Sequence, residues 1–264
     1  MTVPNDADDV WRWRDRAAQW LALPLGRYLD YGCGRGELIE AVSASATEAH
    51  GVDVDDAKIA EASKRNPAAS FSVVGLDGRT GYPDEHFDTI SIVEVIEHVP
   101  DERATLTELH RILRPGGRLL LTTPHRGLLT FLDVGNFKFL MPRLHRFLHL
   151  HVVRDPAYFA HRFERTEAIG LIGDISVTTG RRPWHRHYRL RDIAGHCPTG
   201  LTIERHGVYF PAMRAFMLLD TILRVATKGR FDRLPWPFSR LERQLSRMAS
   251  PAGDQLVVLM QKTA

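Results

Sequence analysis

The chain has 264 residues, 44% of them hydrophobic and 25% charged, with a formal net charge of +3 at pH 7. This composition is ordinary for a globular protein with one α/β domain and additions, and so small a net charge gives no indication of nucleic-acid binding. Only two cysteines are present, Cys33 and Cys197, which argues against a disulfide framework, and a reducing cytoplasmic location is expected.

The apolar segments do not indicate a membrane protein. Residues 1–9 are acidic and lack the apolar core of a signal peptide. The most apolar later stretch, residues 208–226, is interrupted by Arg214, Asp220 and Arg224, which argues against a membrane span. We therefore expect no transmembrane segment.

The first expected element is a helix over residues 9–23, within an N-terminal region that ends at residue 26. It carries Trp11, Trp13 and Trp20 among alternating charges. These rings either pack against the main domain or cover a ligand bound there, and packing is the favoured role.

A glycine-rich turn follows the first expected strand, residues 25–31. Asp30 stands near the end of that strand, and Gly32, Gly34 and Gly36 alternate before the next helix. Glycine tolerates positive φ and lets a ligand approach the bare backbone, and the start of a helix attracts anionic or polar groups. The spacing is not the G-x-G-x-x-G of a dinucleotide site, and no GK[ST] indicates a nucleoside triphosphate. The turn either binds another ligand or only connects the strand to the helix.

A second strand is expected over residues 50–55, and it ends in acidic residues. Asp53 lies about twenty residues beyond the glycine turn, where a carboxylate at a strand tip accepts hydrogen bonds from ribose hydroxyls. Val54, next to it, is assigned to the same site. Asp55 and Asp56 are expected to cap the following helix.

Three further strands are expected over residues 70–74, 87–93 and 118–124, and the second of these is apolar enough to be buried on both faces. A helix over residues 102–113 separates the last two strands. This alternation of strands and helices predicts a doubly wound, mostly parallel α/β sheet. Asp77, which follows the third strand of the chain, either contacts the ligand or shapes a turn.

The order and spacing of these motifs resemble the class I S-adenosylmethionine-dependent methyltransferases. The residues that carry the resemblance are Asp30 to Gly36, Val52-Asp53, Phe87-Asp88, Glu97-His98 and Leu113 to Gly117. The resemblance implies an enzyme with a Rossmann-like seven-stranded sheet, a core over residues 27–125, and S-adenosyl-L-methionine as the cofactor. It also implies which residues bind the methionine end, the ribose, the adenine and the reaction centre: Asp30, Gly32, Gly34, Gly36, Asp53, Val54, Asp77 and Glu94.

The pattern is interrupted after Pro124, and residues 126–198 are expected to form an inserted helical cap that binds the acceptor. Lys and Arg outnumber Asp and Glu in this cap, and histidines and apolar residues are frequent. Such a surface suits an acceptor with an acidic or hydroxylated part. An ordinary solvated lid or a dimer surface has a similar composition.

Residues 199–264 are expected to return to the core. Strands are expected over residues 201–205 and 255–260, separated by an inserted pair of helices over residues 212–226 and 238–248. Wide apolar faces on these helices favour core packing or a homodimer interface. Contact with a membrane surface or a lipid acceptor is the alternative.

Glu94-x-x-Glu97-His98 places two carboxylates and an imidazole within about one helical turn. Carboxylates favour hard divalent ions, and an imidazole can complete a mixed site. The pattern resembles the ubiquinone-pathway O-methyltransferases and the small-RNA 2′-O-methyltransferases, and it implies Mg²⁺ or Mn²⁺. Resemblance to the latter group adds a further ligand, His185 or His187. In the alternative without metal, Glu97 caps or pairs, and His98 lines the pocket or acts as a base.

The transfer of a methyl group to a hydroxyl requires removal of a proton, and His98, His125 and His145 are the candidate bases. The many histidines favour an O-methyltransferase that acts on a hydroxylated small molecule, with a sugar or glycan as the narrower expectation. RNA 2′-O-methylation is the enzymatic alternative, although the charge is low for an RNA-binding protein. A non-catalytic S-adenosylmethionine-binding or scaffold protein is the alternative of another class.

Overall fold

The chain is described from a computed structural model, which covers residues 16–21, 23–75, 77–128, 130–133, 136–154, 156–160, 186–211, 213–227, 241, 244–245 and 248–263. It divides into two compact units. Unit 1 comprises Met1–Thr123, Leu190–His206 and Val257–Ala264, and unit 2 comprises Pro124–Arg189 and Gly207–Leu256. Residues 126–189 of the expected cap fall in unit 2 and residues 190–198 in unit 1, and the cap as a separate domain stays a prediction.

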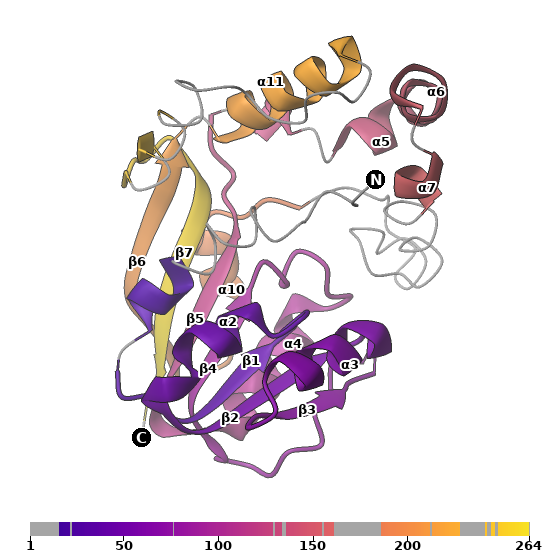
Figure 1. Ribbon diagram of the computed structural model, residues 1–264. Coiled ribbons are helices and arrows are strands. Elements are labelled where there is room, and N and C mark those ends of the chain that lie inside the picture. Colours follow the sequence, from indigo (N-terminus) through magenta and orange to yellow (C-terminus); the bar gives the residue numbers. More distant parts are fainter. Residues whose placement is uncertain are drawn as a thin grey trace. The chain divides into compact units, whose positions relative to one another are not determined.

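Seven strands form one sheet in the order β3-β2-β1-β4-β5-β7-β6 (Figure 1). The pairs β1–β2, β1–β4, β2–β3 and β4–β5 are parallel, as the alternation of strands and helices predicts. This arrangement confirms the expected seven-stranded α/β sheet. The strands are β1 Gly26–Tyr31, β2 Ala46–Asp53, β3 Ser70–Val73, β4 Phe87–Val93, β5 Leu113–Pro124, β6 Leu201–Pro211 and β7 Gly253–Lys262.

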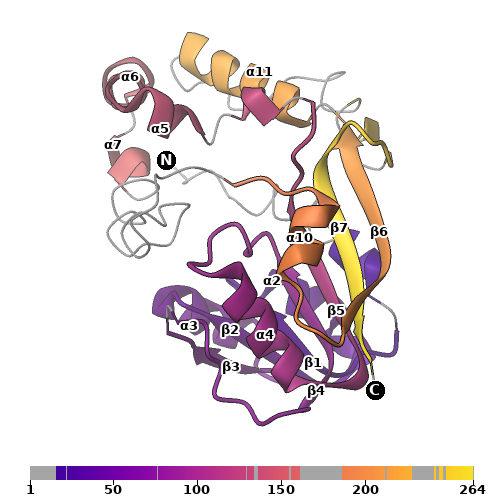
Figure 2. The same ribbon diagram turned by 180° about the vertical axis from the view of Figure 1, so that it is seen from behind.

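The core of unit 1 lies where central strands meet the helices that cover them. Ile90 and Ile92 of β4 and Leu119 to Leu121 of β5 are completely buried, which explains their continuous apolar sequence. Figure 2 shows α4 and α10 next to each other on one face of the sheet, and the Arg103 guanidinium donates a 2.6 Å hydrogen bond to the carbonyl of Gly195. The helices of this unit are α2 Glu37–Val42, α3 Asp56–Arg65, α4 Glu102–Ile112 and α10 Leu190–His196.

Two expectations about helices can be compared with the structure. Asp55 is the N-cap of α3, because its carboxylate accepts hydrogen bonds from the N–H groups of Ala57 and Lys58, as expected. Within the expected N-terminal helix, residues 16–20 are helical, and the remaining residues up to 15, with Trp11 and Trp13, lie outside the described part. Trp20 is buried with the Arg205 guanidinium 4.1 Å from its ring centroid, so it has the packing role.

The start of β5 differs from the expectation. The sequence predicts a strand from residue 118, but β5 begins at Leu113. Phe87 pairs with Leu113 and Thr89 pairs with Arg118, so the residues between Leu113 and Arg118 form an irregular loop within the strand. Gly116 permits this loop because its φ is 75°.

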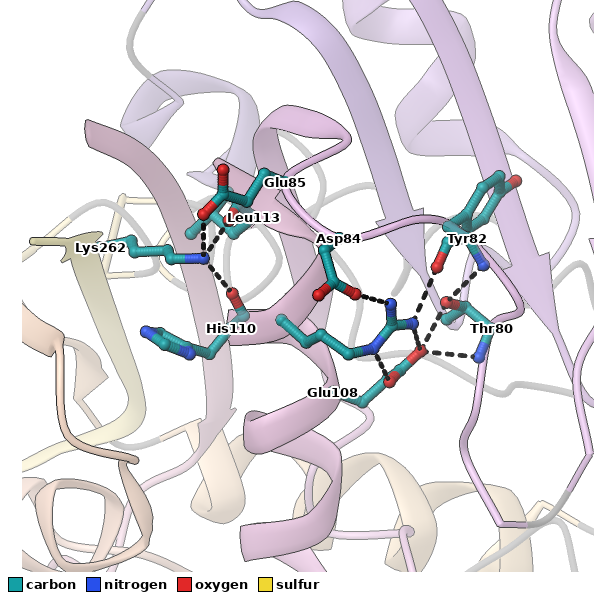
Figure 3. A network of polar contacts seen from close by, with 9 residues as sticks. Thr80, Tyr82, Asp84, Glu85, Glu108, His110, Leu113 and Lys262 are labelled. Atoms are coloured by element: carbon teal, nitrogen blue, oxygen red, sulfur yellow. Dashed lines mark hydrogen bonds and ion pairs between the residues drawn. The ribbon is translucent and has the colours of Figure 1, made fainter. Parts of the chain in front are cut away.

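The far end of α4 is held by two cationic side chains. The Lys262 ammonium donates hydrogen bonds to the carbonyls of His110 (3.0 Å) and Leu113 (2.7 Å), and Glu85 lies near it, as Figure 3 shows. The last carbonyls of a helix lack intrahelical partners and carry partial negative charge, so a buried ammonium satisfies both requirements. Lys262, the last residue of β7, thus fastens the sheet to α4.

The second cation, Arg111, fixes the loop before β4. Its guanidinium contacts Asp84 (2.6 Å), both carboxylate oxygens of Glu108 (2.9 and 2.8 Å) and the carbonyl of Tyr82 (2.8 Å). Burial alone would raise the pKa of Glu108, but hydrogen bonds from Arg111 and from Thr80 lower it to about 2. Figure 3 shows Glu108 between Asp84 and Thr80.

The described residues of unit 2 form short helical segments and one longer helix. The short segments are Thr130–Leu132, α5 Phe137–Leu140, α6 Pro142–Phe147, the π-helical Leu148–Val153 and α7 Pro156–Phe159. The longer helix, α11 Met213–Ala226, confirms the helix expected over residues 212–226, whereas most of the helix expected over residues 238–248 lies outside the described residues. Within the part of the chain that the structure describes, none of the helices has the length and apolar character of a membrane span.

Candidate functional site

The glycine turn connects β1 to α2 in unit 1. Gly32, Gly34 and Gly36 have φ values of 79°, 54° and 77°, which side chains with a Cβ rarely adopt. A Cβ at Gly32 would overlap the side chain of Val95, and one at Gly36 would overlap Asn66, so neighbouring residues also exclude a side chain there. At Gly34 a Cβ would meet only Glu37 Oε2, at 4.0 Å. The open side of the turn is therefore at Gly34.

Asp53 lies at the end of β2, next to this turn, and is buried. Its Oδ2 accepts a 2.9 Å hydrogen bond from the N–H of Gly34, and its Oδ1 accepts a 3.0 Å hydrogen bond from the N–H of Asp55. Each carboxylate oxygen has two lone pairs, so both can accept a further hydrogen bond from a pair of vicinal hydroxyls. Val54, half-buried, follows it directly.

Asp30 is the second buried carboxylate of the site. Its Oδ1 accepts a 2.6 Å hydrogen bond from Ser91 Oγ, which in turn is 2.6 Å from Tyr28 Oη. Burial, reinforced by the charges of Asp53 and Glu37, raises the pKa of Asp30 to about 7 although the Ser91 hydrogen bond opposes it. An ammonium group of a ligand would favour the charged form of this carboxylate.

Asp77 has the turn-shaping role that was one of its two expected roles. It is exposed, and its Oδ1 accepts a 3.2 Å hydrogen bond from the N–H of Arg79. Gly78 between them has a φ of 74°, and its carbonyl accepts a hydrogen bond from Tyr31 Oη at 3.1 Å. Recognition of adenine by Asp77 stays a prediction.

Glu94, Glu97 and His98 follow β4 within unit 1. Glu94 has a φ of 54°, and its carboxylate accepts a 2.8 Å hydrogen bond from Thr122 Oγ1. Glu97 is almost fully buried and accepts a 3.1 Å hydrogen bond from Thr123 Oγ1. His98 Nε2 lies 3.8 Å from Glu97 Oε1, so the structure brings these two together.

Thr122 and Thr123 are not among the residues that the sequence pattern predicts for this site. The signal is present in the sequence, because these two hydroxyl residues directly follow the apolar run Leu119 to Leu121 of β5, and β5 pairs with β4, which precedes Glu94. Among the described residues, no three His, Cys, Asp or Glu side chains gather as a metal site requires. Binding of a divalent ion by Glu94, Glu97 and His98 stays a prediction, and His185, an expected ligand, lies outside the described residues.

The remaining predicted residues belong to unit 2. His187 Nε2 lies 2.6 Å from Asp133 Oδ2, and both side chains are buried, so this histidine is paired. His145, on α6, is buried among rings, with ring centroids 5.8 Å from Phe137 and 4.7 Å from His149.

His125 follows β5 and is half-buried. Its Nδ1 lies 2.9 Å from the carbonyl oxygen of Gly253. A carbonyl only accepts hydrogen bonds, so Nδ1 carries the proton and Nε2 is the accepting nitrogen of the neutral ring. The tautomer of His125, one of the candidate bases, is thus fixed by a contact that the structure records.

Comparisons with known proteins point to one family. The family described as methyltransferase domain matches residues 6–172. The ubiquinone biosynthesis O-methyltransferase of Pseudomonas syringae pv. tomato is 31% identical over 104 residues, which cover 38% of this chain and 45% of that protein. A probable S-adenosylmethionine-dependent methyltransferase of Mycolicibacterium smegmatis is 31% identical over 129 residues, covering 47% and 50%. The chain thus spans about half the length of the curated relatives it matches.

The fold has relatives among solved structures. The [4+2]-cyclase SpnF covers 100% of this chain and 85% of its own, with a TM-score of 0.59 and 17% sequence identity. So low an identity shows a shared fold and nothing about the reaction.

Proposed function

The chain belongs to the class I S-adenosylmethionine-dependent methyltransferases, and on this premise we propose that it is an O-methyltransferase for the hydroxyl of a small-molecule acceptor. The bound cofactor would supply an electrophilic methyl group on its sulfonium. The residues of this chain have to hold the cofactor, align the acceptor and take up the proton of the hydroxyl.

The residues at the glycine turn fit the cofactor. Gly34 leaves open space beside the backbone, and Asp53 next to it can accept from both ribose hydroxyls while it keeps its two backbone hydrogen bonds. The buried carboxylate of Asp30 suits the ammonium group of the methionine end. Asp77 would contact the adenine, and Glu94 and Val54 would line the site.

The observation that carries the proposed O-methylation is the fixed tautomer of His125. A hydroxyl has a pKa far above neutrality, so its methylation requires a base that is unprotonated and correctly oriented. The hydrogen bond from His125 Nδ1 to the Gly253 carbonyl leaves Nε2 for that proton. The relatives named ubiquinone biosynthesis O-methyltransferase support the same class of acceptor atom.

The acceptor we propose is a sugar, a glycan or a comparable polyhydroxylated molecule. The support is the basic stretch from residue 138 to residue 191, in which Arg143 and Arg146 are exposed on α6. Guanidinium groups donate several hydrogen bonds in a fixed geometry and suit acidic or hydroxylated groups. We further propose a cytoplasmic homodimer, because both cysteines are unpaired thiols and α11 exposes Met217, Leu219 and Ile222.

A transfer screen tests this proposal. Glycans, phenols and RNA oligonucleotides are incubated with the protein and methyl-labelled S-adenosylmethionine, and the labelled atom is located by mass spectrometry. We expect label on a hydroxyl oxygen of a glycan or phenol, lost in the variant His125→Asn, which should still bind S-adenosylhomocysteine. Label only on nitrogen or carbon would overturn the proposal. Label on RNA with a steep dependence on salt would favour 2′-O-methylation instead.

A further inference from the structure

Arg214 and Asp254 form a buried ion pair in unit 2, outside the residues so far given a role. Arg214, on the first turn of α11, is 2% exposed, and Asp254, at the start of β7, is 0% exposed. Arg214 Nη1 lies 2.5 Å from Asp254 Oδ1, and the N–H of Arg214 donates a 3.1 Å hydrogen bond to Oδ2. A buried ion pair contributes little net stability, because the desolvation of both charges offsets their attraction. A buried ion pair that adds little stability can still be useful if it positions a neighbouring residue.

The same two residues form hydrogen bonds with both the N–H and the carbonyl of the His125 backbone. The His125 N–H donates a 2.8 Å hydrogen bond to the carbonyl of Asp254. The His125 carbonyl accepts a 2.7 Å hydrogen bond from Arg214 Nη2. His125 therefore cannot shift without breaking a contact to a group that is itself fixed by a charge.

The residues on either side of His125 and the carbonyl that binds its imidazole ring are fixed as well. Tyr188 donates to the Pro124 carbonyl and accepts from the Arg126 N–H, each at 2.9 Å. A Cβ at Gly253 would overlap the backbone of Tyr209, so Gly253, whose carbonyl binds the ring of His125, is held by close packing. Because Gly253 precedes Asp254 in the chain, the ion pair and the ring contact are coupled through one peptide group.

We propose that Arg214 and Asp254 are positioning residues that keep His125 in the Nδ1–H tautomer with Nε2 available to the acceptor. The inference rests on the proposed role of His125 as the base. If the pair is removed, the Gly253 peptide and the His125 backbone can move apart, and the ring then loses the acceptor that selects its tautomer.

The test begins with the unmodified protein and needs no acceptor. Two-bond ¹H–¹⁵N spectra of protein labelled with ¹⁵N-histidine distinguish the two tautomers, and the variant His125→Asn assigns the signal. We expect the Nδ1–H form, and an Nε2–H form in the parent protein would overturn the proposal whether or not any variant folds.

The second step removes the ion pair of Arg214 and Asp254, which we call the clamp. The double variant Arg214→Met with Asp254→Leu does so without leaving a buried charge. We expect a mixture of tautomers, unchanged affinity for S-adenosylhomocysteine, and at least about a tenfold lower kcat at unchanged KM with the acceptor found in the screen. Arg214→Lys, which keeps the charge, should restore most of the Nδ1–H form. The matched control is Lys262→Met, which removes another buried cation bound to carbonyls and should leave the His125 spectrum unchanged.

The outcomes separate this inference from the proposed function. The positioning role is overturned if the double variant and Arg214→Lys both keep the single tautomer of the parent protein. It is also overturned if Lys262→Met changes the His125 spectrum as much as the double variant does. The tautomer can change as expected while His125→Asn keeps full turnover. In that case Arg214 and Asp254 do position His125, but His125 is not the base, and the catalytic part of the inference is overturned.

Discussion

The N–H of Gly34 donates a 2.9 Å hydrogen bond to Oδ2 of Asp53, which joins the glycine turn to the end of the neighbouring strand. With its other oxygen bound to the N–H of Asp55, the carboxylate is oriented without a ligand. Pre-organised groups of this kind lower the entropic cost of binding. Asp53 thus fixes the shape of the turn, and the same orientation suits the contact with ribose that we propose.

Replacing Asp53 by Ala should weaken the binding of S-adenosylhomocysteine. Loss of the charged acceptor for two hydroxyls should cost about 1.5–3 kcal/mol, roughly 10- to 150-fold in Kd. Isothermal titration calorimetry measures the change in affinity. The control is Asp56→Ala, which removes an exposed acid at the first position of the neighbouring helix α3. Equal affinities of parent and Asp53→Ala protein would show that the ribose is bound elsewhere.

Gly34→Ala separates backbone strain from occupation of the ligand's space. Gly116→Ala is the matched control, because Gly116 also has a positive φ and no atoms within 4 Å of an added Cβ. Both variants should lose about 1–2 kcal/mol of stability from the left-handed backbone. Only Gly34→Ala should also bind S-adenosylhomocysteine at least about tenfold more weakly. Equal affinities in the two variants would mean that the open side of the turn at Gly34 does not face the cofactor.

The sequence predicts the sheet and this turn because both depend on patterns within a few residues. Alternating glycines, acids at strand ends and continuous apolar strands are local signals, and Asp30, Gly34 and Asp53 lie where those signals place them. The beginning of β5 at Leu113 was missed because Arg114 to Gly117 has the composition of a turn that ends a helix.

The contacts around His125 could not be predicted from local patterns. Its ring binds the carbonyl of Gly253, 128 positions away in the sequence, and Arg214 and Asp254 are 40 positions apart. Such pairs are set by the order of strands in the sheet and by the return of the chain after a long insertion. Single-residue features of Arg214 or Asp254 give no indication of them.

Asp30 should make the stability of the ligand-free protein depend on pH. Burial raises its pKa to about 7, whereas an aspartate in an unfolded chain titrates near about 3.9. Between these values the folded state keeps a proton that the unfolded state has released, so the free energy of unfolding falls as the pH rises from about 4 to about 7. The contribution amounts to up to about 4 kcal/mol.

Asp30→Asn, which is neutral at every pH, should flatten that slope in urea unfolding measured between pH 4.5 and pH 7.5. These pH values are about the bounds of the window in which the two states differ in bound protons. The exposed Asp56→Asn serves as the control and should keep the slope of the parent protein. A parent slope retained in Asp30→Asn would place the responsible group elsewhere.

Lys262→Met should destabilise unit 1 at the end of α4. The change removes hydrogen bonds to the carbonyls of His110 and Leu113 and leaves them buried without that donor, which should cost about 1–3 kcal/mol. The surface pair of Arg118 and Glu204 gives the comparison, because Arg118→Gln should cost about 0–1 kcal/mol. Thermal unfolding followed by circular dichroism measures both, and equal losses would contradict the capping role of Lys262.

The last prediction decides how the hydroxyl is activated. The carboxylate of Glu94 accepts a hydrogen bond from Thr122, and that of Glu97 accepts one from Thr123, so both carboxylates already have hydrogen-bond donors. If they bound Mg²⁺ or Mn²⁺, chelator would abolish turnover, and Glu97→Gln would regain activity at high metal concentration. If His125 is the base, turnover should be insensitive to chelator and should fall at low pH as the imidazole becomes charged. We expect the second result, with His125→Asn at least about a hundredfold slower, the usual contribution of a general base. Full loss of activity in chelator, restored by Mg²⁺ alone, would contradict it and assign the activation to a metal ion.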